Sequence, residues 1–154
     1  GLCKRLGHDA TGEPGSWKNG TAAVEAFAQS IGCAPSWITL HDGSGLSSKD
    51  KVAPKAFTTV LACMAARPDG DAFINTLARP GEDGTLRRRF KGMPVADAIH
   101  AKTGHISGVS TLSGIIDAGG RRFAFSILVN HYKGNVNPWQ DQVCQAIYAW
   151  ATTK

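Results

Sequence analysis

The chain has 154 residues, of which 42% are hydrophobic and 8% aromatic, and this composition is that of an ordinary globular protein with a real core. The net charge of +5 favours anionic partners, but the one basic cluster, Arg87–Arg89, lacks interleaved aromatics, so we expect no nucleic-acid partner. No apolar run approaches the roughly 20 residues of a membrane span, and none is expected.

The first residues contain neither a starting methionine nor a signal peptide. We therefore expect a processed product or a piece of a longer chain. The four cysteines show no Cys-x-x-Cys pattern and no metal-ligand spacing, so we predict no metal or cofactor. Three disulfide pairings and four buried free thiols remain open alternatives for Cys3, Cys33, Cys63 and Cys144.

The N-terminal third predicts helices joined by loops. Leu2–Leu6 is predicted as the end of a helix stopped by Gly7, with a polar loop from His8 to Gly15. A second helix is predicted from Trp17 to Ile31, followed by a short strand at 37–40. The apolar face of this second helix is expected to consist of Gly20, Ala23, Val24, Phe27 and Ile31.

A loop rich in glycine and hydroxyl groups follows at residues 42–47, with the sequence Asp-Gly-Ser-Gly-Leu-Ser. Its two glycines permit backbone conformations closed to other residues, and Asp42 can accept hydrogen bonds from nearby amides. Asp42 and Ser44 are candidate binding residues, and a tight turn before a helix is the alternative. Helices are predicted at 54–66 and 71–77, and a helical turn at 85–90.

After Gly92 the apolar period changes to that of strands. Ala98–His105, Val109–Asp117 and Arg122–His131 are three strand candidates with short connections, which predicts an antiparallel meander. Asn137 is predicted to cap a last helix, whose buried stripe is expected to be Trp139, Val143, Ile147 and Trp150. Residues 1–154 are therefore predicted to form one α+β domain, a three-stranded antiparallel sheet covered by helices.

Lys102, Thr103 and Gly104 stand in a row on the first predicted strand. Lysine supplies a positive charge, threonine a hydroxyl donor, and glycine lets a ligand lie against the backbone, so the triplet suits an anionic, peptide-like ligand. A solvated lysine before a turn glycine is the alternative. Because Lys102 and Thr103 point to opposite faces of a flat strand, both can serve one ligand only beside an exposed edge.

Three ordered stretches together give a family resemblance. They are residues 42–47, then Asp83–Leu86 with Arg89, and then Ala101–Gly104 continuing through Leu112–Gly114. In order and spacing the chain resembles the C-terminal part of the serine D-alanyl-D-alanine carboxypeptidases of the peptidase S13 group, which are low-molecular-mass penicillin-binding proteins. The resemblance implies that the three strands belong to a larger sheet of the penicillin-binding, serine β-lactamase-like type.

The resemblance also implies acyl transfer by a serine nucleophile, which removes the terminal D-Ala from peptidoglycan stem peptides and is acylated by penicillins. Lys102 would hold positive charge beside the reaction centre, Thr103 would bind the substrate carboxylate, and Gly104 would let the peptide approach. The backbone amide of His105 would be an oxyanion donor. The implied location is exported, either periplasmic or associated with the cell wall.

The sequence offers no suitable serine nucleophile. Ser48–Lys51 is the single Ser-x-x-Lys match, it falls in a predicted loop, and no Ser-x-Asn occurs. We therefore expect the chain alone to be inactive, and we expect its partner to be the N-terminal portion of the same enzyme or a second copy of itself. The alternative is a non-enzymatic module that binds peptidoglycan or another partner.

Overall fold

The computed structural model describes residues 1–82 and 84–153, so Asp83 of the second motif lies outside the described residues. The chain divides into two compact units, residues 1–60 and 61–154. The helix α3, Pro54–Ala65, runs from the first unit into the second. The predicted α+β class is confirmed, with helices and a three-stranded antiparallel sheet.

The first unit begins with two packed helices, α1 at Leu2–Thr11 and α2 at Trp17–Ser30. The predicted stop at Gly7 is wrong, because α1 continues through Gly7 and ends at Gly12, whose φ of 73° is left-handed. Gly7 lies where the helices touch, since a Cβ there would stand 2.6 Å from the backbone nitrogen of Gly20. This glycine permits close helix packing and does not end a helix.

The rest of the first unit is short and weakly apolar. A 3-10 helix, Pro35–Trp37, leads into β1 at Ile38–Thr39, which pairs antiparallel with β2 at Lys51–Val52. The predicted strand at 37–40 is therefore shorter in the structure. The predicted inward position of Phe27 is wrong, because 44% of this residue is exposed. The small core contains Ala28, Cys33 and Ala56, with Trp37, Ile38 and Val52 packed against it.

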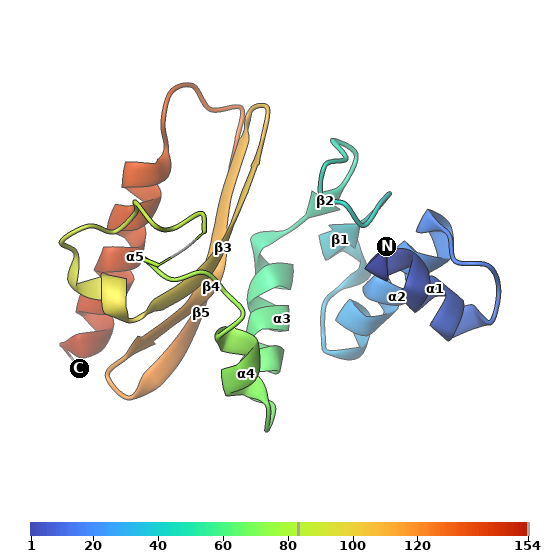
Figure 1. Cartoon of the computed structure of the whole chain (residues 1–154), viewed down its shortest axis with the longest axis horizontal. Helices are drawn as coiled ribbons and strands as arrows, with labels where there is room; N and C mark the ends of the chain where they lie inside the picture. Colours follow the sequence, from blue (N-terminus) through green and yellow to red (C-terminus); the bar gives the residue numbers. More distant parts are fainter. Residues whose placement is uncertain (83, 154) are drawn as a thin grey trace. The chain divides into compact units, whose positions relative to one another are not determined.

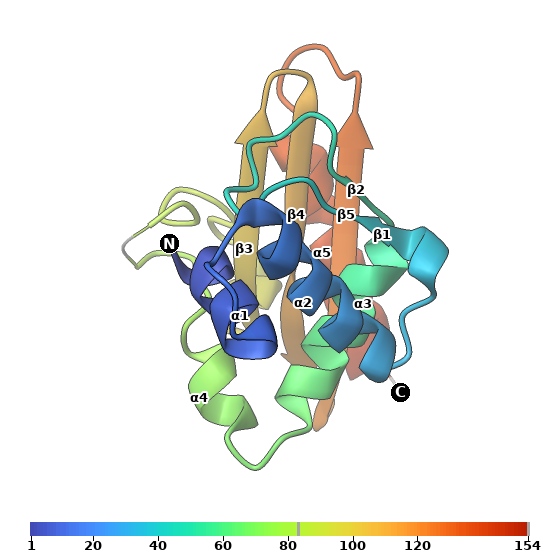
Figure 2. The same ribbon diagram turned by 90° about the vertical axis from the view of Figure 1, so that its right-hand side faces the viewer.

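The second unit is built on the predicted meander of β3 (Ile99–Ile106), β4 (Val109–Ala118) and β5 (Arg121–Asn130). Figure 2 shows β4 between the other two strands. The register is continuous from Ile99↔Ile116 to Ile106↔Val109, so side chains alternate regularly between the two faces along β3. The strand predictions are confirmed within one residue at each end.

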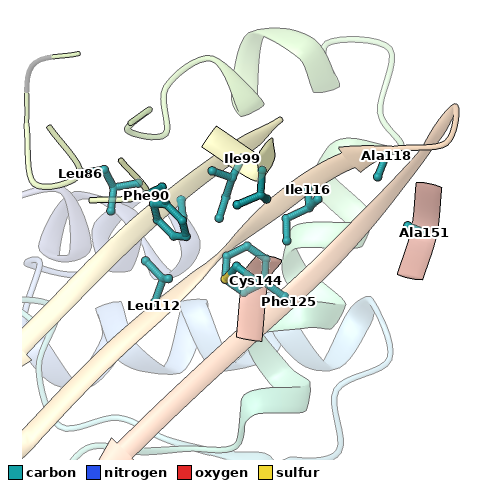
Figure 3. Close-up of a cluster of buried hydrophobic side chains, with 11 residues drawn as sticks. Leu86, Phe90, Ile99, Leu112, Ile116, Ala118, Phe125, Cys144 and Ala151 are labelled. Atoms are coloured by element: carbon teal, nitrogen blue, oxygen red, sulfur yellow. The ribbon is translucent and has the colours of Figure 1, made fainter. Parts of the chain in front are cut away.

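The helix α5, Asn137–Thr152, covers one face of this sheet (Figure 1). Figure 3 shows the main core between them, in which side chains of all three strands meet α5 and the segment before β3. Burial raises the pKa of the Cys144 thiol in this core to about 12, so the thiol stays protonated and acts as a small apolar group. All four cysteines are free thiols, but only Cys33 and Cys144 are buried, whereas Cys3 and Cys63 are partly exposed, so the thiol alternative holds for the pairing state and only in part for burial.

The predicted buried stripe of α5 is wrong at both tryptophans. Trp139 and Trp150 are 54% and 50% exposed, whereas Gln140, Cys144 and Ala151 are buried. The buried face is displaced by one residue because the side of α5 that carries Cys144 and Ala151 packs into the core of the sheet, a tertiary contact that helix periodicity alone does not specify. Asn137 is its first residue and not its cap, and the side chain of Asn135 accepts a hydrogen bond from the Asn137 amide at 3.0 Å.

The opposite face of the sheet is partly covered by α3 from Leu61 onward and by α4, Gly70–Ile74. Leu61 and Ile74 pack there against Ile115 of β4. After α4 the chain pairs briefly with β3 through Ala78, forms turns from residue 84 to residue 92, and enters a 3-10 helix at Pro94–Asp97.

Candidate functional site

The outer edge of β3 is the main candidate site. Ala101 exchanges two backbone hydrogen bonds with Ala78, at 2.9 and 3.1 Å. In an antiparallel ladder the amide and carbonyl of one residue point to the same side, and successive residues alternate. Ala101, Thr103 and His105 therefore turn these groups away from β4. In the described part of the chain no strand pairs with this edge beyond Ala101, so the edge is open at Thr103 and His105.

Lys102 reaches this edge from one face of the sheet. Ala101 belongs to the core beneath α5, so alternation places Thr103 and His105 on the α5 face and Lys102 on the opposite face. The Nζ of Lys102 nevertheless donates to the outward-facing carbonyl of Thr103 at 2.5 Å. The Lys102 ammonium group and the Thr103 side chain can thus contact one ligand that lies beside the strand. This arrangement is the one expected from the sequence, in which both residues serve one ligand only beside an exposed edge.

The face that carries Lys102 changes character along its length. Near Ile115 this face is apolar and covered. Lys102, however, pairs across the sheet with Ser113, which in turn pairs with Ser126. The hydroxyl oxygens of Ser113 and Ser126 lie 2.8 Å apart. Gly104 has a packing reason of its own, because a Cβ there would stand 2.4 Å from Oγ1 of Thr111. Close packing against Thr111 is therefore enough to explain the glycine, and the approach of a ligand would explain it equally well.

Two contacts hold the far end of the edge. The amide of His131 donates to the carbonyl of Gly108 at 2.7 Å, which ties the segment after β5 to the β3–β4 turn. The Tyr132 hydroxyl lies 3.1 Å from Nδ1 of His105, with the rings edge to face. The His105 ring is therefore oriented by Tyr132, a residue that no sequence pattern marked as part of the site.

The loop at residues 42–47 lies in the first unit and is organised by Asp42. Its Oδ1 accepts from the amide and hydroxyl of Ser44, at 2.8 and 2.9 Å, and from the Gly45 amide at 3.3 Å. The hydrogen bond from the Ser44 amide is the main reason that the pKa of Asp42 is lowered. Both candidate side chains therefore stabilise the turn, which matches the structural alternative, and their binding role stays a prediction.

The loop also needs glycine at one position. A Cβ on Gly43 would stand 2.4 Å from Cβ of Cys3 on α1, so the loop packs closely against that helix. Ser48 lies in a turn and Lys51 in β2. The two residues are therefore not arranged along one helical turn, as a serine nucleophile and its lysine would be.

The sequence profile of the D-Ala-D-Ala carboxypeptidase 3 (S13) family matches residues 1–154. The chain belongs to this family. It is 33% identical over 138 residues to a D-alanyl-D-alanine carboxypeptidase of Actinomadura sp. (strain R39), covering 86% of this chain and 26% of that protein. It is 36% identical over 122 residues to the D-alanyl-D-alanine carboxypeptidase DacB of Haemophilus influenzae, covering 77% of this chain and 26% of that protein.

The fold of this S13 chain agrees with a solved relative. It matches the crystal structure of penicillin binding protein 4 (dacB) from Haemophilus influenzae, complexed with a novel β-lactam, at a TM-score of 0.81. The identity is 29%, and the match covers 98% of this chain and 37% of the other. The S13 chain thus spans about a quarter of the length of the curated relatives it matches. Among the helices of residues 1–82 and 84–153, none is long and apolar enough to cross a membrane.

Two residues of the candidate site had no sequence pattern to reveal them. Ala78 acts through its backbone hydrogen bonds, which its residue type does not reveal. Tyr132 is an isolated aromatic residue after β5. The stretch from Lys102 to His105, in contrast, lies on β3 as predicted.

Proposed function

We propose that this chain provides the substrate-binding edge of a serine-type D-Ala-D-Ala carboxypeptidase, and that the nucleophile belongs to a part of the enzyme outside this chain. The observation that carries the proposal is the open β3 edge, where the amide of His105 faces outward and Lys102 reaches the carbonyl of Thr103. Membership of the S13 family supports the reaction class.

In the proposed reaction, the serine oxygen attacks the carbonyl carbon of the penultimate D-Ala. The proton of the serine hydroxyl is passed on to the nitrogen of the terminal D-Ala, the bond between that nitrogen and the carbonyl carbon breaks, and D-Ala leaves with its carboxylate. Water then hydrolyses the ester and regenerates the serine. The His105 amide would donate to the developing oxyanion, a role worth about 3 kcal/mol in comparable sites. Lys102 and the Thr103 hydroxyl would bind the terminal carboxylate.

The partners follow from the same chemistry. Peptidoglycan stem peptides are the proposed substrates, and β-lactams the proposed acylating inhibitors, because both present a carbonyl close to a carboxylate. Such substrates place the complete enzyme outside the cytoplasmic membrane, in the periplasm or the cell wall. The outer edge of β5, which no strand of the described residues pairs with, supports contact with the nucleophile-bearing part of the enzyme or with a second copy of the chain.

The test is acylation by labelled penicillin. The complete enzyme is expected to become labelled and this chain alone is not; a label on this chain would contradict the absence of a nucleophile. Lys102→Ala in the complete enzyme is expected to slow acylation by about 100-fold or more. Lys91→Ala is the control, since Lys91 is exposed in the turn before Gly92. Equal acylation rates for the two variants would contradict the role proposed for Lys102.

A further inference from the structure

The backbone of His105 is restrained less than the backbone on either side of it. Gly104 and Ile106 turn their amides and carbonyls toward β4, with which they pair. His105 turns the same groups outward, where no strand of the described residues pairs with them. An amide that has to meet an oxyanion at a fixed point therefore needs a restraint from outside the sheet.

The other end of the same edge has such a restraint in its backbone. At Ala101 the outward amide and carbonyl both bond to Ala78, at 2.9 and 3.1 Å. At His105 the restraint comes through the side chain, since Nδ1 lies 3.1 Å from the Tyr132 hydroxyl and the ring centroids are 6.3 Å apart. A tyrosine hydroxyl both donates and accepts, so this hydrogen bond forms with either neutral tautomer of the imidazole.

Tyr132 itself lies on a restrained segment between β5 and α5. The preceding residue, His131, has a left-handed φ of 54°, which is uncommon for a residue other than glycine. The His131 amide donates to the carbonyl of Gly108 in the β3–β4 turn at 2.7 Å. At the other end of the segment, the Asn137 amide donates to the side chain of Asn135 where α5 begins. Both ends of the segment are thus fixed, and Tyr132 can hold its partner in place.

The strand beside His105 is also supported from α5. Ser110 of β4 stands opposite His105 in the register and is 5% exposed. Its hydroxyl accepts from Nε2 of Gln140, a fully buried residue in the first turn of α5, at 3.4 Å. This end of the sheet is therefore supported at two points, by Gln140 on β4 and by Tyr132 on β3.

We propose that Tyr132 is a positioning residue, which holds the outward amide of His105 at the oxyanion through its hydrogen bond to the His105 ring. The inference rests on the proposed function, because it uses the oxyanion role of that amide. A misplacement of about 1 Å in such a site can cost about 100-fold in rate. Because the oxyanion develops only toward the transition state, loss of the restraint slows acylation and leaves the binding of the unreacted ligand nearly unchanged.

The first experiment measures acylation of the complete enzyme at rising concentrations of labelled penicillin, which separates the limiting rate from the half-maximal concentration. Tyr132→Phe removes one hydroxyl and keeps the ring. It is expected to lower the limiting rate about tenfold and to change the half-maximal concentration by less than about twofold. Tyr148→Phe is the matched control, because it makes the same change at the chain's other tyrosine, which packs against the core beneath α5. It is expected to retain the native rate.

The outcomes separate the two proposals. An unchanged limiting rate in Tyr132→Phe, or a change confined to the half-maximal concentration, would overturn the positioning role. An equal loss in Tyr148→Phe would overturn it as well. Absence of acylation in the native complete enzyme would instead overturn the proposed function.

A double-mutant cycle tests whether Tyr132 acts through the His105 ring. His105→Ala keeps the backbone amide and removes the ring, so it is expected to lower the limiting rate about tenfold as well. In the His105→Ala background, Tyr132→Phe is expected to change the rate by less than about twofold. A further tenfold loss in the double variant would mean that Tyr132 acts independently of the ring, and would overturn the proposal.

Amide hydrogen exchange reports the restraint without catalysis. In the complete enzyme, Tyr132→Phe is expected to speed exchange at Gly104 and Ile106 by about fivefold or more. Exchange at Ala101, whose amide donates to Ala78, is expected to stay native. Native exchange at all three amides would overturn the proposal, and so would an equal increase at all three, which would indicate a loss of global stability.

Discussion

The two units are stabilised in different ways. Among the described residues, the main core of the second unit contains eleven buried residues, contributed by three long strands, α5 and the segment before β3. The core of the first unit contains three buried residues, and its strands are two residues long. Polar contacts are prominent there instead, such as the Ser16–Asn19 capping box and the hydrogen bond from the Leu40 amide to Glu25. Apolar burial thus fixes the strand that carries Lys102, whereas short-range hydrogen bonds fix the Asp42 loop.

The largest expected effect comes from the buried ion pair of the second unit. Asp141→Asn removes the charge that Arg89 pairs with, and the side chains of Arg89 and Asp141 are only 9% and 10% exposed. Asp141 also accepts from the amide of Phe90, whose φ of 58° is unusual for a large residue. An uncompensated buried charge lowers the free energy of unfolding by about 3 to 5 kcal/mol, measured by urea unfolding.

The matched control lies in the first unit. Asp9→Asn breaks the Arg5–Asp9 pair on α1, whose side chains are 72% and 50% exposed. A loss of about 0.5 kcal/mol or less is expected there. Equal losses of unfolding free energy for the two variants would show that the buried ion pair of the second unit stabilises the protein no more than the exposed pair of the first.

A pair of leucine truncations compares apolar burial directly. Leu112 of β4 is fully buried and Leu46 of the first-unit loop is 72% exposed. Leu112→Ala is expected to lower the free energy of unfolding by about 3 kcal/mol, because it removes methyl groups from a packed core and leaves a cavity. Leu46→Ala is expected to change it by about 0.5 kcal/mol or less. A large loss at Leu46 would show that this loop residue is buried in the folded protein.

The same contrast explains what the sequence could predict. The meander was predictable because strand periodicity and short connections are local, and Lys102–His105 therefore took its place on β3. Gly7 was misread because a glycine needed for helix contact looks the same in sequence as one that ends a helix. The tryptophans of α5 were misplaced because tertiary packing decides which side of a helix meets the sheet, and here that side carries Cys144 and Ala151.

The site was predictable only in part, for a related reason. Residue types reveal groups that act through side chains, such as Lys102, but not those that act through backbone, such as Ala78. The outward direction of the His105 amide depends on which residue of β3 pairs with which partner. That register is a tertiary property, and no local pattern contains it.

Helix contact in the first unit gives the third prediction. In an exposed helix, glycine to alanine stabilises by up to about 1 kcal/mol. At Gly7 the sign is expected to reverse, because the new Cβ would stand 2.2 Å from Oδ1 of Asn19 and close to the Gly20 backbone. Gly7→Ala should lower the free energy of unfolding by about 1 to 2 kcal/mol, with faster amide exchange in α1 and α2. A stabilised Gly7→Ala variant would show that the helices are not in close contact.

The smallest expected effect is a pH dependence that belongs to the second unit. His100 of β3 is 8% exposed, and its buried Nδ1 has no hydrogen-bond partner within the described residues. Burial lowers the pKa of His100 from 6.5, and the nearby Arg79 lowers it further, with Asp117 and Glu82 acting in the opposite direction. The folded state therefore binds fewer protons at this site than the unfolded state between the lowered pKa and 6.5.

Stability must consequently fall as the pH drops below about 6.5 and level off below the lowered pKa of His100. The slope from this one group is at most about 1.4 kcal/mol per pH unit. Urea unfolding of the native chain and of His100→Gln, measured at steps from neutral to mildly acidic pH, isolates the contribution, because glutamine does not titrate. The difference in unfolding free energy between the two should shift toward the variant as the pH falls. Parallel profiles would mean that His100 gains its proton in the folded state as readily as in the unfolded chain, which would require water or a counter-charge at the buried Nδ1.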